Sequence, residues 1–431
     1  MKRLLISAIA AAGLFGVATP NSVAATGPVQ LSSDPAVQWN AFLLGLQATP
    51  GDQPATVHPT YDLAVMHTAL NNAVQSAQTR VPRFPASPAA AADAAAHDTL
   101  VALYPTLRPA IEQQYATLIN RVPHGARRAA GIRVGRRAAR AVLADRAGDG
   151  SGAAPTPFTP GTAPGDYQLT PPALAAPVFT NWGRVRPFVL RRGFTFRPPA
   201  PPPLTSPRYA AAINEVRTLG IATGSTRTPD QTQIGLFWNA PIWATWNQIA
   251  QTVISARHGT LSDDAQTFAG LDLILADSVI GLYDAKYTYH LWRPITAIRA
   301  ADTDGNPATA GDPTWTPLSN TAPDPSYPGA HATVSAAAAS VLASRYGDGT
   351  SFVVTSTALP GVQRSFTSFS AAAGEASTSR IYNGNHTRLD ENAGQQLGQN
   401  VARFVLRSAA PLGLVPRQQQ RVRRPQQRKH R

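Results

Sequence analysis

The chain contains no cysteine among its 431 residues. This absence excludes disulfides, thiolate catalysis and metal sites built from cysteine. Lysine is nearly absent as well, since Lys2 and Lys429 stand near the two ends and Lys286 is the one lysine between them. Arginine supplies almost all other positive charge, so the isolated Lys286 in an aromatic segment is a candidate functional residue. The alternative is a chance lysine that extends its ammonium group to solvent.

Charged residues are also few, at 14% of the chain, and beyond the N-terminus we expect no stretch apolar for long enough to span a membrane. Hydrophobic residues make up 43%, which excludes wholesale disorder. The length is enough for one large domain or two ordinary ones with a sizeable core. The 39 prolines predict helices joined by long proline-rich connections.

The first residues have the pattern of a secretory signal peptide. Lys2 and Arg3 precede an apolar stretch from Leu4 to about Val17, and the small residues 22–24 provide a cleavage site. A membrane anchor is the alternative, but the apolar stretch is short for a span. We therefore expect residues 1–25 to be a signal peptide, and the mature chain to be secreted without a transmembrane span.

The formal net charge of +14 favours anionic partners. Part of this charge lies in an arginine-rich segment at 126–147 and part in the C-terminal tail. The arginines of the first segment alternate with alanines and have no aromatic stacking partners, so we expect a solvated helix face and no specific nucleic-acid binding. The tail is expected to be disordered. It could touch anionic surfaces, although non-specific charge is the simpler account.

Apolar residues recur at helical spacing along most of the chain, which predicts an all-α fold of helical bundles. The spacing predicts helices at 36–46, 61–78, 89–103, 110–121, 126–147, 208–219, 231–256, 261–296, 328–346 and 378–407. Residues 151–207 are rich in proline and predict a long connection over the surface. Five aromatic side chains are expected to anchor it: Phe179, Trp182, Phe188, Phe194 and Phe196.

Three segments carry residues suited to binding an oxyanion. The first, KYTYHLWRP, begins at Lys286 and places Arg293 seven positions later. Seven residues are about two helical turns, so on a continuous helix the two cations would share a face. Pro294 would bend or end that helix close to the charges.

The second segment, DPSYPGAH, places His331 in the first turn of a predicted helix, directly after Gly329 and Ala330. Free backbone N–H groups at such a helix start bind anions, and small residues let an anion approach. A histidine at this position can exchange protons with the bound group.

The third segment, SRIYNGNHTRLD, contains Arg380, His386 and Asp390. On one helix His386 and Asp390 would share a face, and the carboxylate would fix the tautomer of the imidazole. The Arg380 guanidinium can bind an oxyanion with two N–H groups. Taken alone, this segment is also typical of an ordinary ion-paired helix. Together the three segments predict an oxyanion site held by positive charge, with no need of a metal cation.

In order and spacing, these segments resemble the three signature motifs of the type 2 phosphatidic acid phosphatase superfamily. The helical N-terminal half and stretches such as PGDYQLTPP and RTPDQTQIGLFW are most similar to the secreted bacterial vanadium-dependent haloperoxidases of that superfamily. The resemblance implies one haloperoxidase-like helical domain at 26–410, with a phosphatase-superfamily core at about 231–407. Residues 411–431 would form the basic disordered tail.

The resemblance also implies what the site residues do. His386 would bind the vanadium of vanadate, His331 would be the general acid/base, and Asp390 would orient His386. The vanadate oxygens would be held by cations and by the helix start, namely by Lys286, Arg293, Arg380, Gly329 and Ala330. The implied reaction is oxidation of halide by hydrogen peroxide. Two alternatives stay open: an acid phosphatase that attacks a phosphomonoester through a phosphohistidine at His386 and needs no cofactor, and a non-catalytic anion-binding protein.

The second motif departs from the family pattern. The usual Pro-Ser-Gly-His is Pro328-Gly329-Ala330-His331 in this chain, so the serine hydroxyl that would donate to the oxyanion is missing at Gly329. Loss of one such donor costs roughly 2.7–4 kcal/mol of transition-state stabilisation. If the missing hydroxyl matters, Gly329→Ser is expected to raise activity. A fall or no change would mean that the pocket has adapted around Gly329 and Ala330.

Overall fold

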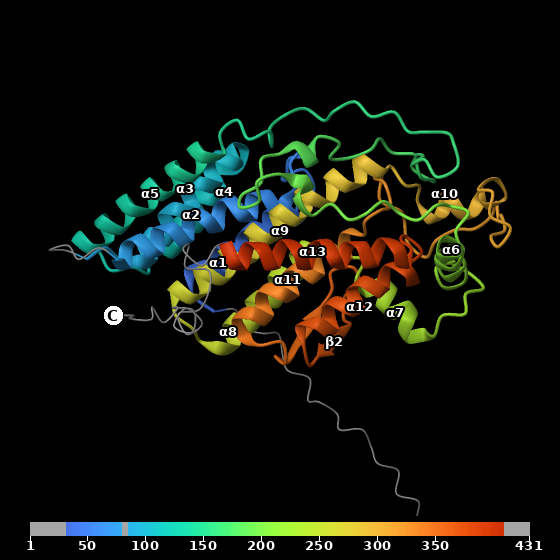
Figure 1. The fold of residues 1–431 in the computed structure, drawn as a ribbon. Coiled ribbons are helices and arrows are strands. Elements are labelled where there is room, and N and C mark those ends of the chain that lie inside the picture. Colours follow the sequence, from blue (N-terminus) through green and yellow to red (C-terminus); the bar gives the residue numbers. More distant parts are fainter. Residues whose placement is uncertain (1–31, 80–84, 409–431) are drawn as a thin grey trace, which may run out of the picture. The chain divides into compact units, whose positions relative to one another are not determined.

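The computed structural model describes residues 32–79 and 85–408 (Figure 1). Within these ranges the chain forms thirteen α-helices and one two-stranded sheet, which confirms the all-α prediction. The predicted signal peptide at 1–25 and the predicted tail at 411–431 lie outside the described residues, and both stay predictions.

Five helices precede residue 150, close to the predicted ranges. They are α1 (Pro35–Ala48), α2 (Pro59–Thr79), α3 (Pro88–Leu103), α4 (Arg108–Ile119) and α5 (Ala126–Arg146). Proline at the first helical position and a side-chain cap start two of them, with Asp34 capping α1 and Ser87 capping α3. Helix α5 packs on α2 and α3 through small residues, and most of its arginines face solvent, as predicted.

Helix α9 (Leu261–Tyr289) is the central element of the fold. It contacts α2 on one side, and α11 (Ala330–Tyr346) and α13 (Arg388–Ser408) on the other. In Figure 1 it runs as the yellow ribbon between the blue helices and the orange-red ones. Contrary to expectation, α9 is long and apolar enough to cross a membrane, but 94% of its most apolar window is buried within the protein. Such burial is what a core helix requires.

The connection between α5 and α6 (Pro207–Leu219) contains only two short 3-10 helices, η2 (Trp182–Arg184) and η3 (Gly193–Phe196). The Asp277 carboxylate of α9 fixes it by accepting the backbone N–H groups of residues 188–190 at 2.6 to 2.9 Å. Trp182 is buried, and three of the predicted anchors, Phe179, Phe188 and Phe196, pack against the core. Phe194 is 54% exposed, so its predicted anchoring role is wrong.

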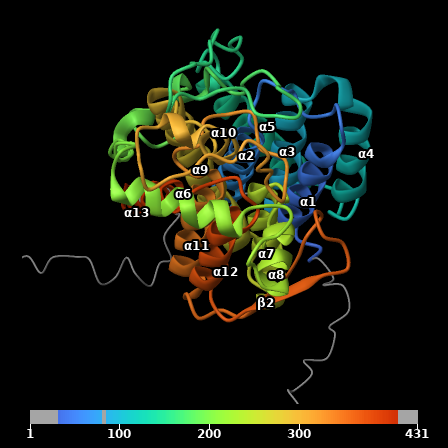
Figure 2. The same ribbon diagram turned by 90° about the vertical axis from the view of Figure 1, so that its right-hand side faces the viewer.

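The remaining elements surround the C-terminal helices. They are α7 (Pro229–Phe237), α8 (Ile242–Arg257), α10 (Pro294–Arg299), α12 (Phe369–Tyr382) and an antiparallel pair, β1 (Phe352–Thr355) with β2 (Gln363–Phe366). Figure 2 shows α11 and α12 beside α7 and α8, and these helices are in contact. The strand pair was not predicted, because each strand has only four residues.

Three helices that the spacing predicted as continuous are each broken. The predicted helix at 231–256 stops at Phe237 and restarts after Pro241, whose ring cannot occupy a helix interior. The one at 261–296 stops at Tyr289, where His290 has a left-handed backbone, and restarts at Pro294. The one at 378–407 is interrupted between Tyr382 and Arg388, where Gly384 has a φ of +84°.

Helices α11 and α13 approach so closely that two positions of α13 must be glycine. A Cβ built on Gly394 would lie 3.0 Å from the Cβ of Ala332 and closer still to a backbone oxygen of Gly329. A Cβ built on Gly398 would lie 3.0 Å from the backbone N of Ala337 and closer to the carbonyl oxygen of Thr333. This contact fixes the N-terminal turns of both helices side by side, and those turns carry candidate site residues.

We predict that Gly398→Ala lowers the free energy of unfolding by about 1–3 kcal/mol, because the added methyl group forces the two helices apart. Urea denaturation measures the change. The matched control is Gly374→Ala in α12, where an added Cβ meets nothing within 4 Å. It should raise stability by about 0.5–1 kcal/mol through helix propensity. Equal effects of both substitutions would contradict the close approach of α11 and α13.

Candidate active site

The three segments predicted to bind an oxyanion lie together. Lys286 is in the last turn of α9, Arg293 is the N-cap of α10, and Arg380 is in the last turn of α12. All three cations are at most 6% exposed. His386 precedes α13 and is 2% exposed, and its Nε2 lies 3.0 Å from Nη1 of Arg293. His331 lies in the first turn of α11. Burial and electrostatic interactions with Arg380 and His386 lower its pKa.

Asp324 occupies the middle of these cations, and the sequence analysis did not single it out. Arg293 donates from Nη2 to its carboxylate and from Nε to its carbonyl oxygen at 2.7 Å. The Lys286 ammonium lies 3.5 Å from the same carboxylate and donates to the carbonyl oxygens of Pro325 and Ser326. The loop at 324–326 is therefore tied to both α9 and α10 by buried charge.

Lys286 and Arg293 do not share a helix face, which corrects the sequence prediction. The left-handed His290 ends α9 between them, and Pro294 starts α10 instead of ending α9. The two side chains converge because both bind the loop that carries Asp324. Arg293 also donates to the carbonyl oxygen of Asn385 at 3.0 Å, so it holds the His386 segment in place.

His386 and Asp390 are likewise not on one helix, because α13 begins at Arg388. Asp390 forms a capping box with Thr387: its Oδ2 accepts the Thr387 N–H at 2.7 Å and the Thr387 hydroxyl at 3.0 Å. The same oxygen accepts from Ser326 Oγ at 2.8 Å and lies 3.5 Å from Nδ1 of His386. Asp390 therefore caps the start of α13, and the same carboxylate also faces the imidazole of His386.

The lone pair of His386 faces the cations. A guanidinium can only donate, so Nε2 accepts from Arg293 and the ring proton is assigned to Nδ1, on the side of Asp390. Burial, followed by the charges of Arg293 and Lys286, holds the pKa of His386 well below its usual value. A neutral imidazole with a lone pair on Nε2, here hydrogen-bonded by Arg293, is the form that a ligand or a nucleophile needs.

The segment between α7 and α8 positions the other two candidate residues. Nε2 of His331 donates to the carbonyl oxygen of Trp238 at 2.8 Å, which leaves Nδ1 as the acceptor of the neutral ring. Nη1 of Arg380 donates to Oδ1 of Asn239 at 3.0 Å. Burial, and then the charge of Arg380, hold the pKa of His331 well below its usual value. The His331 ring is therefore held in its neutral form.

The helix start of α11 differs from the prediction in one respect. The N–H of Gly329 donates to the carbonyl oxygen of Asp390 at 2.8 Å, so it is engaged within the protein. Gly329 is the N-cap and provides no side-chain cap, and first-turn N–H groups such as that of Ala330 have no intrahelical partner. The helix start therefore still offers donors, but one residue later than predicted.

A side chain at position 329 would meet Glu391. A Cβ built on Gly329 lies 2.8 Å from the carboxyl carbon of Glu391 and closer still to its Oε1. Glu391 is 1% exposed, so a serine at 329 requires this buried side chain to move. The effect of Gly329→Ser on activity stays a prediction.

The charges of the site suit a bound anion. Burial lowers the pKa of Lys286 to about 8 and that of Arg380 to about 10, as expected for cations deprived of water. Although burial opposes it, the charges of Lys286 and Arg293 hold the pKa of Asp324 below its usual value. A carboxylate is itself an oxyanion, so these donors fit one. Among the described residues Nε of Arg380 is buried without a hydrogen-bond partner, which leaves it free for another oxygen.

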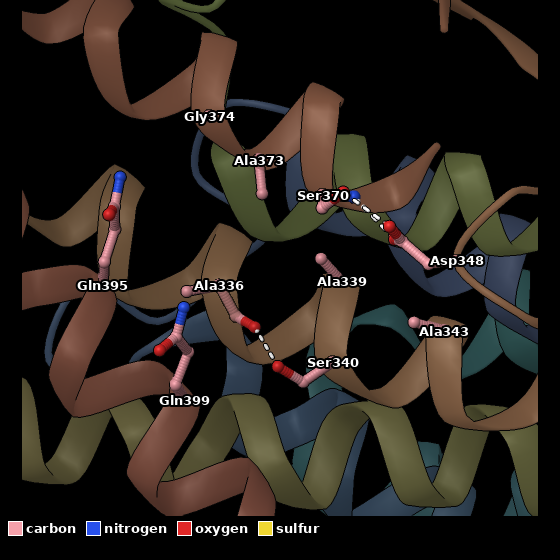
Figure 3. A pocket seen from close by; sticks show the side chains of 10 residues that line it. All are labelled: Ala336, Ala339, Ser340, Ala343, Asp348, Ser370, Ala373, Gly374, Gln395 and Gln399. Atoms are coloured by element: carbon pink, nitrogen blue, oxygen red, sulfur yellow. Dashed lines mark hydrogen bonds between the residues drawn. The ribbon is translucent and has the colours of Figure 1, made fainter. Parts of the chain in front are cut away.

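The site is reached from the side of α7 and α8. Asn239 is exposed, and Ala330 and His331 are partly exposed, whereas the remaining site residues are buried. A hollow of about 240 Å³ between α11, α12 and α13 lies elsewhere (Figure 3). Its wall is mostly small and uncharged, and includes Ala336, Ala339, Ala343 and Gly374, with Asp348 bonded to Ser370. None of the predicted site residues lines this hollow.

Sequence reasoning missed four contributors: Asp324, Ser326, Asn239 and Glu391. Asp324 and Ser326 stand just before the second motif, and Glu391 follows Asp390 directly. Polar residues next to a motif were the available signal, but it does not distinguish a loop residue from a site residue. Asn239 gave no signal, because it was expected inside a continuous helix.

We predict that Asp324→Asn lowers the free energy of unfolding by about 3–5 kcal/mol, because Lys286 and Arg293 lose their buried counter-charge. Inorganic phosphate should then raise the melting temperature of the variant more than that of the unmodified protein, since the anion replaces the lost charge. Thermal denaturation with and without phosphate measures both effects. Asp145→Asn, which breaks an exposed pair with Arg186, is the control and should cost at most about 1 kcal/mol. A phosphate effect equal in both variants would contradict the prediction.

Comparison with known proteins finds one matching family model, one similar sequence and several similar solved structures. Residues 266–412 match the family model described as the VCPO second helical-bundle domain. A stretch of 152 residues is 29% identical to vanadium chloroperoxidase of Curvularia inaequalis, and it spans 29% of this chain and only 24% of that relative.

Two solved structures match over most of the chain. A bacterial vanadium-dependent iodoperoxidase superposes with a TM-score of 0.71 at 23% identity, covering 88% of this chain and 97% of its own. The holo-type bacterial vanadium-dependent chloroperoxidase gives 0.62 at 16% identity, covering 90% and 95%. At such identities the likeness establishes the fold. The chain is therefore a vanadium-haloperoxidase-like protein, with the helical fold of these enzymes and a VCPO-type second bundle in residues 266–412.

Proposed function

We propose that this protein is a vanadate-dependent haloperoxidase that oxidises halide with hydrogen peroxide. One observation carries the proposal: three buried cations, Lys286, Arg293 and Arg380, surround the acceptor nitrogen of a neutral His386. Three buried cations need more than one negative charge to compensate them, and Asp324 supplies only one. The likeness in fold to vanadium-dependent iodoperoxidase and chloroperoxidase supports the same activity.

Vanadate is the cofactor in this proposal, and when bound it supplies an electrophilic centre that activates hydrogen peroxide for attack by halide. The residues of the chain have separate tasks. Arg380, Lys286 and Arg293 hold the oxygens of the anion and balance its charge. His386 presents Nε2 to it, with its ring fixed by Asp390 and Ser326.

His331 would handle the proton. Its Nε2–H is committed to the carbonyl oxygen of Trp238, so Nδ1 is the atom that accepts a proton at the bound group. The partly exposed ring lies at the accessible side of the site, where peroxide and halide would enter. Burial and Arg380 keep the ring neutral before an anion binds. A bound anion would raise its basicity by opposing the charge of Arg380.

The test is halide oxidation by the purified chain. We expect an organic acceptor to be halogenated only when orthovanadate, hydrogen peroxide and a halide are all present, with iodide tested first because it is the most easily oxidised. His386→Ala should reduce this activity to background. His97→Ala is the control, because His97 pairs with Asp98 and Glu112 outside the site. It should retain full activity.

Other outcomes would assign other functions. If the vanadate-free protein hydrolyses a phosphomonoester and orthovanadate only inhibits it, the protein is a phosphatase that uses His386 as its nucleophile. If neither reaction occurs and phosphate binding is unchanged in His386→Ala, the protein is a non-catalytic anion-binding protein. Either result would overturn the haloperoxidase proposal.

A further inference from the structure

The space at Gly329 is filled by a carboxyl group from another helix. Oε1 of Glu391, in the first turn of α13, lies well within contact distance of a Cβ built on Gly329. The motif that this segment resembles has a serine at that position. In this protein, the place of the serine side chain is therefore taken by a different side chain that also carries oxygen.

Glu391 is bonded at one oxygen only. Oε2 accepts a hydrogen bond from the Ser377 hydroxyl at 3.0 Å, and Glu391 is 1% exposed. Oε1 is buried and has no hydrogen-bond partner within the described part of the chain. Nε of Arg380, whose charge acts on Glu391, is also buried without a partner there. Buried polar atoms are rarely left unpaired, so we take both atoms as available to a bound oxyanion.

We propose that Glu391 binds the oxyanion as a neutral carboxylic acid and replaces the hydrogen-bond donor that the missing serine would have supplied at Gly329. The inference rests on the proposed function only in that an oxyanion must bind at this site. It adds a binding residue, Glu391, that is not one of the residues of the three sequence motifs.

A neutral acid is required, because a carboxylate would repel the anion. Burial, followed by the charge of Asp390, raises the pKa of Glu391 to about 8, while Arg380 and Lys286 oppose the rise. These groups and the Ser377 hydroxyl are the ones that face Glu391 from α13, α12 and α9, and α11 contributes the uncharged backbone of Gly329. Burial therefore favours the acid form of Glu391.

The charge balance agrees. If Glu391 is neutral, the three cations Lys286, Arg293 and Arg380 face two carboxylates, Asp324 and Asp390. One positive charge is then left for the anion. If Glu391 were ionised, the cations and carboxylates would cancel and no net positive charge would favour anion binding.

The experiment measures the dissociation constants of orthovanadate and inorganic phosphate for the full chain by calorimetry at pH 7. Glu391→Gln should bind within about threefold of the unmodified protein, because the amide keeps a donor in the same place. Glu391→Ala should bind about 10- to 100-fold more weakly, the usual loss for a hydrogen bond to a charged group. Gly329→Ser combined with Glu391→Ala should regain most of that loss, since removal of Glu391 makes room for the hydroxyl.

The pH dependence separates a donor from a merely structural carboxyl. The affinity of Glu391→Gln divided by that of the unmodified protein should be close to one below pH 7. Above pH 8 it should rise about tenfold per pH unit, because only the unmodified protein acquires a repelling charge. Both proteins contain Lys286 and bind the same anion, so the ratio removes the titration of the anion and leaves the effect of the Glu391 charge, including its effect on Lys286.

Each result has one meaning. If the unmodified protein binds neither anion, the proposed function fails and with it this inference. If it binds both, but all variants bind equally and the ratio stays flat with pH, the role of Glu391 is overturned while the proposed function stands. Melting curves show which variants are folded. If Glu391→Ala does not fold, the pH ratio with Glu391→Gln decides alone.

Discussion

The buried carboxylate of Asp324, held between Lys286 and Arg293, is the interaction on which the rest of the site depends. It joins the end of α9, the start of α10 and the loop before α11. Arg293 extends the connection to Asn385 and His386. Removing one member of such a cluster leaves uncompensated charge in the core, which is why these elements are fixed relative to one another. The same cluster already binds a carboxylate of the chain, so its donors are arranged around the oxygens of an anion.

The second constraint is the close packing of α11 on α13. Gly394 and Gly398 bring the two helix starts together, so that His331 from one and the Asp390 and Glu391 carboxyls from the other face the same small volume. The Glu391 carboxyl group lies where a side chain at position 329 would be. The residue at 329 and the position of Glu391 therefore depend on each other. At the position where this chain departs from the family motif, the space for a side chain is therefore occupied by the Glu391 carboxyl group.

Helical periodicity predicted where the helices lie but not where they break, and the breaks contain the site. The predicted helix at 231–256 is interrupted where Asn239 binds Arg380, the one at 261–296 where Arg293 caps α10, and the one at 378–407 where His386 precedes α13. A proline or glycine near each break was visible in the sequence, namely Pro241, Pro294 and Gly384. Its effect depends on whether neighbouring elements bind the freed backbone groups, and periodicity holds no information on that.

The sequence by itself determined the all-α class, the extent of most helices, and the cations and histidines that meet in one place, because these follow from residue type and spacing. It also determined that cysteine chemistry is absent. Only the tertiary structure decided that Asp324 neutralises the first motif, that Asp390 caps α13, and that Glu391 fills the position of the missing serine side chain. Each of these depends on contacts between segments distant in the chain or across a helix break, and burial in the assembled core is what gives such contacts their strength.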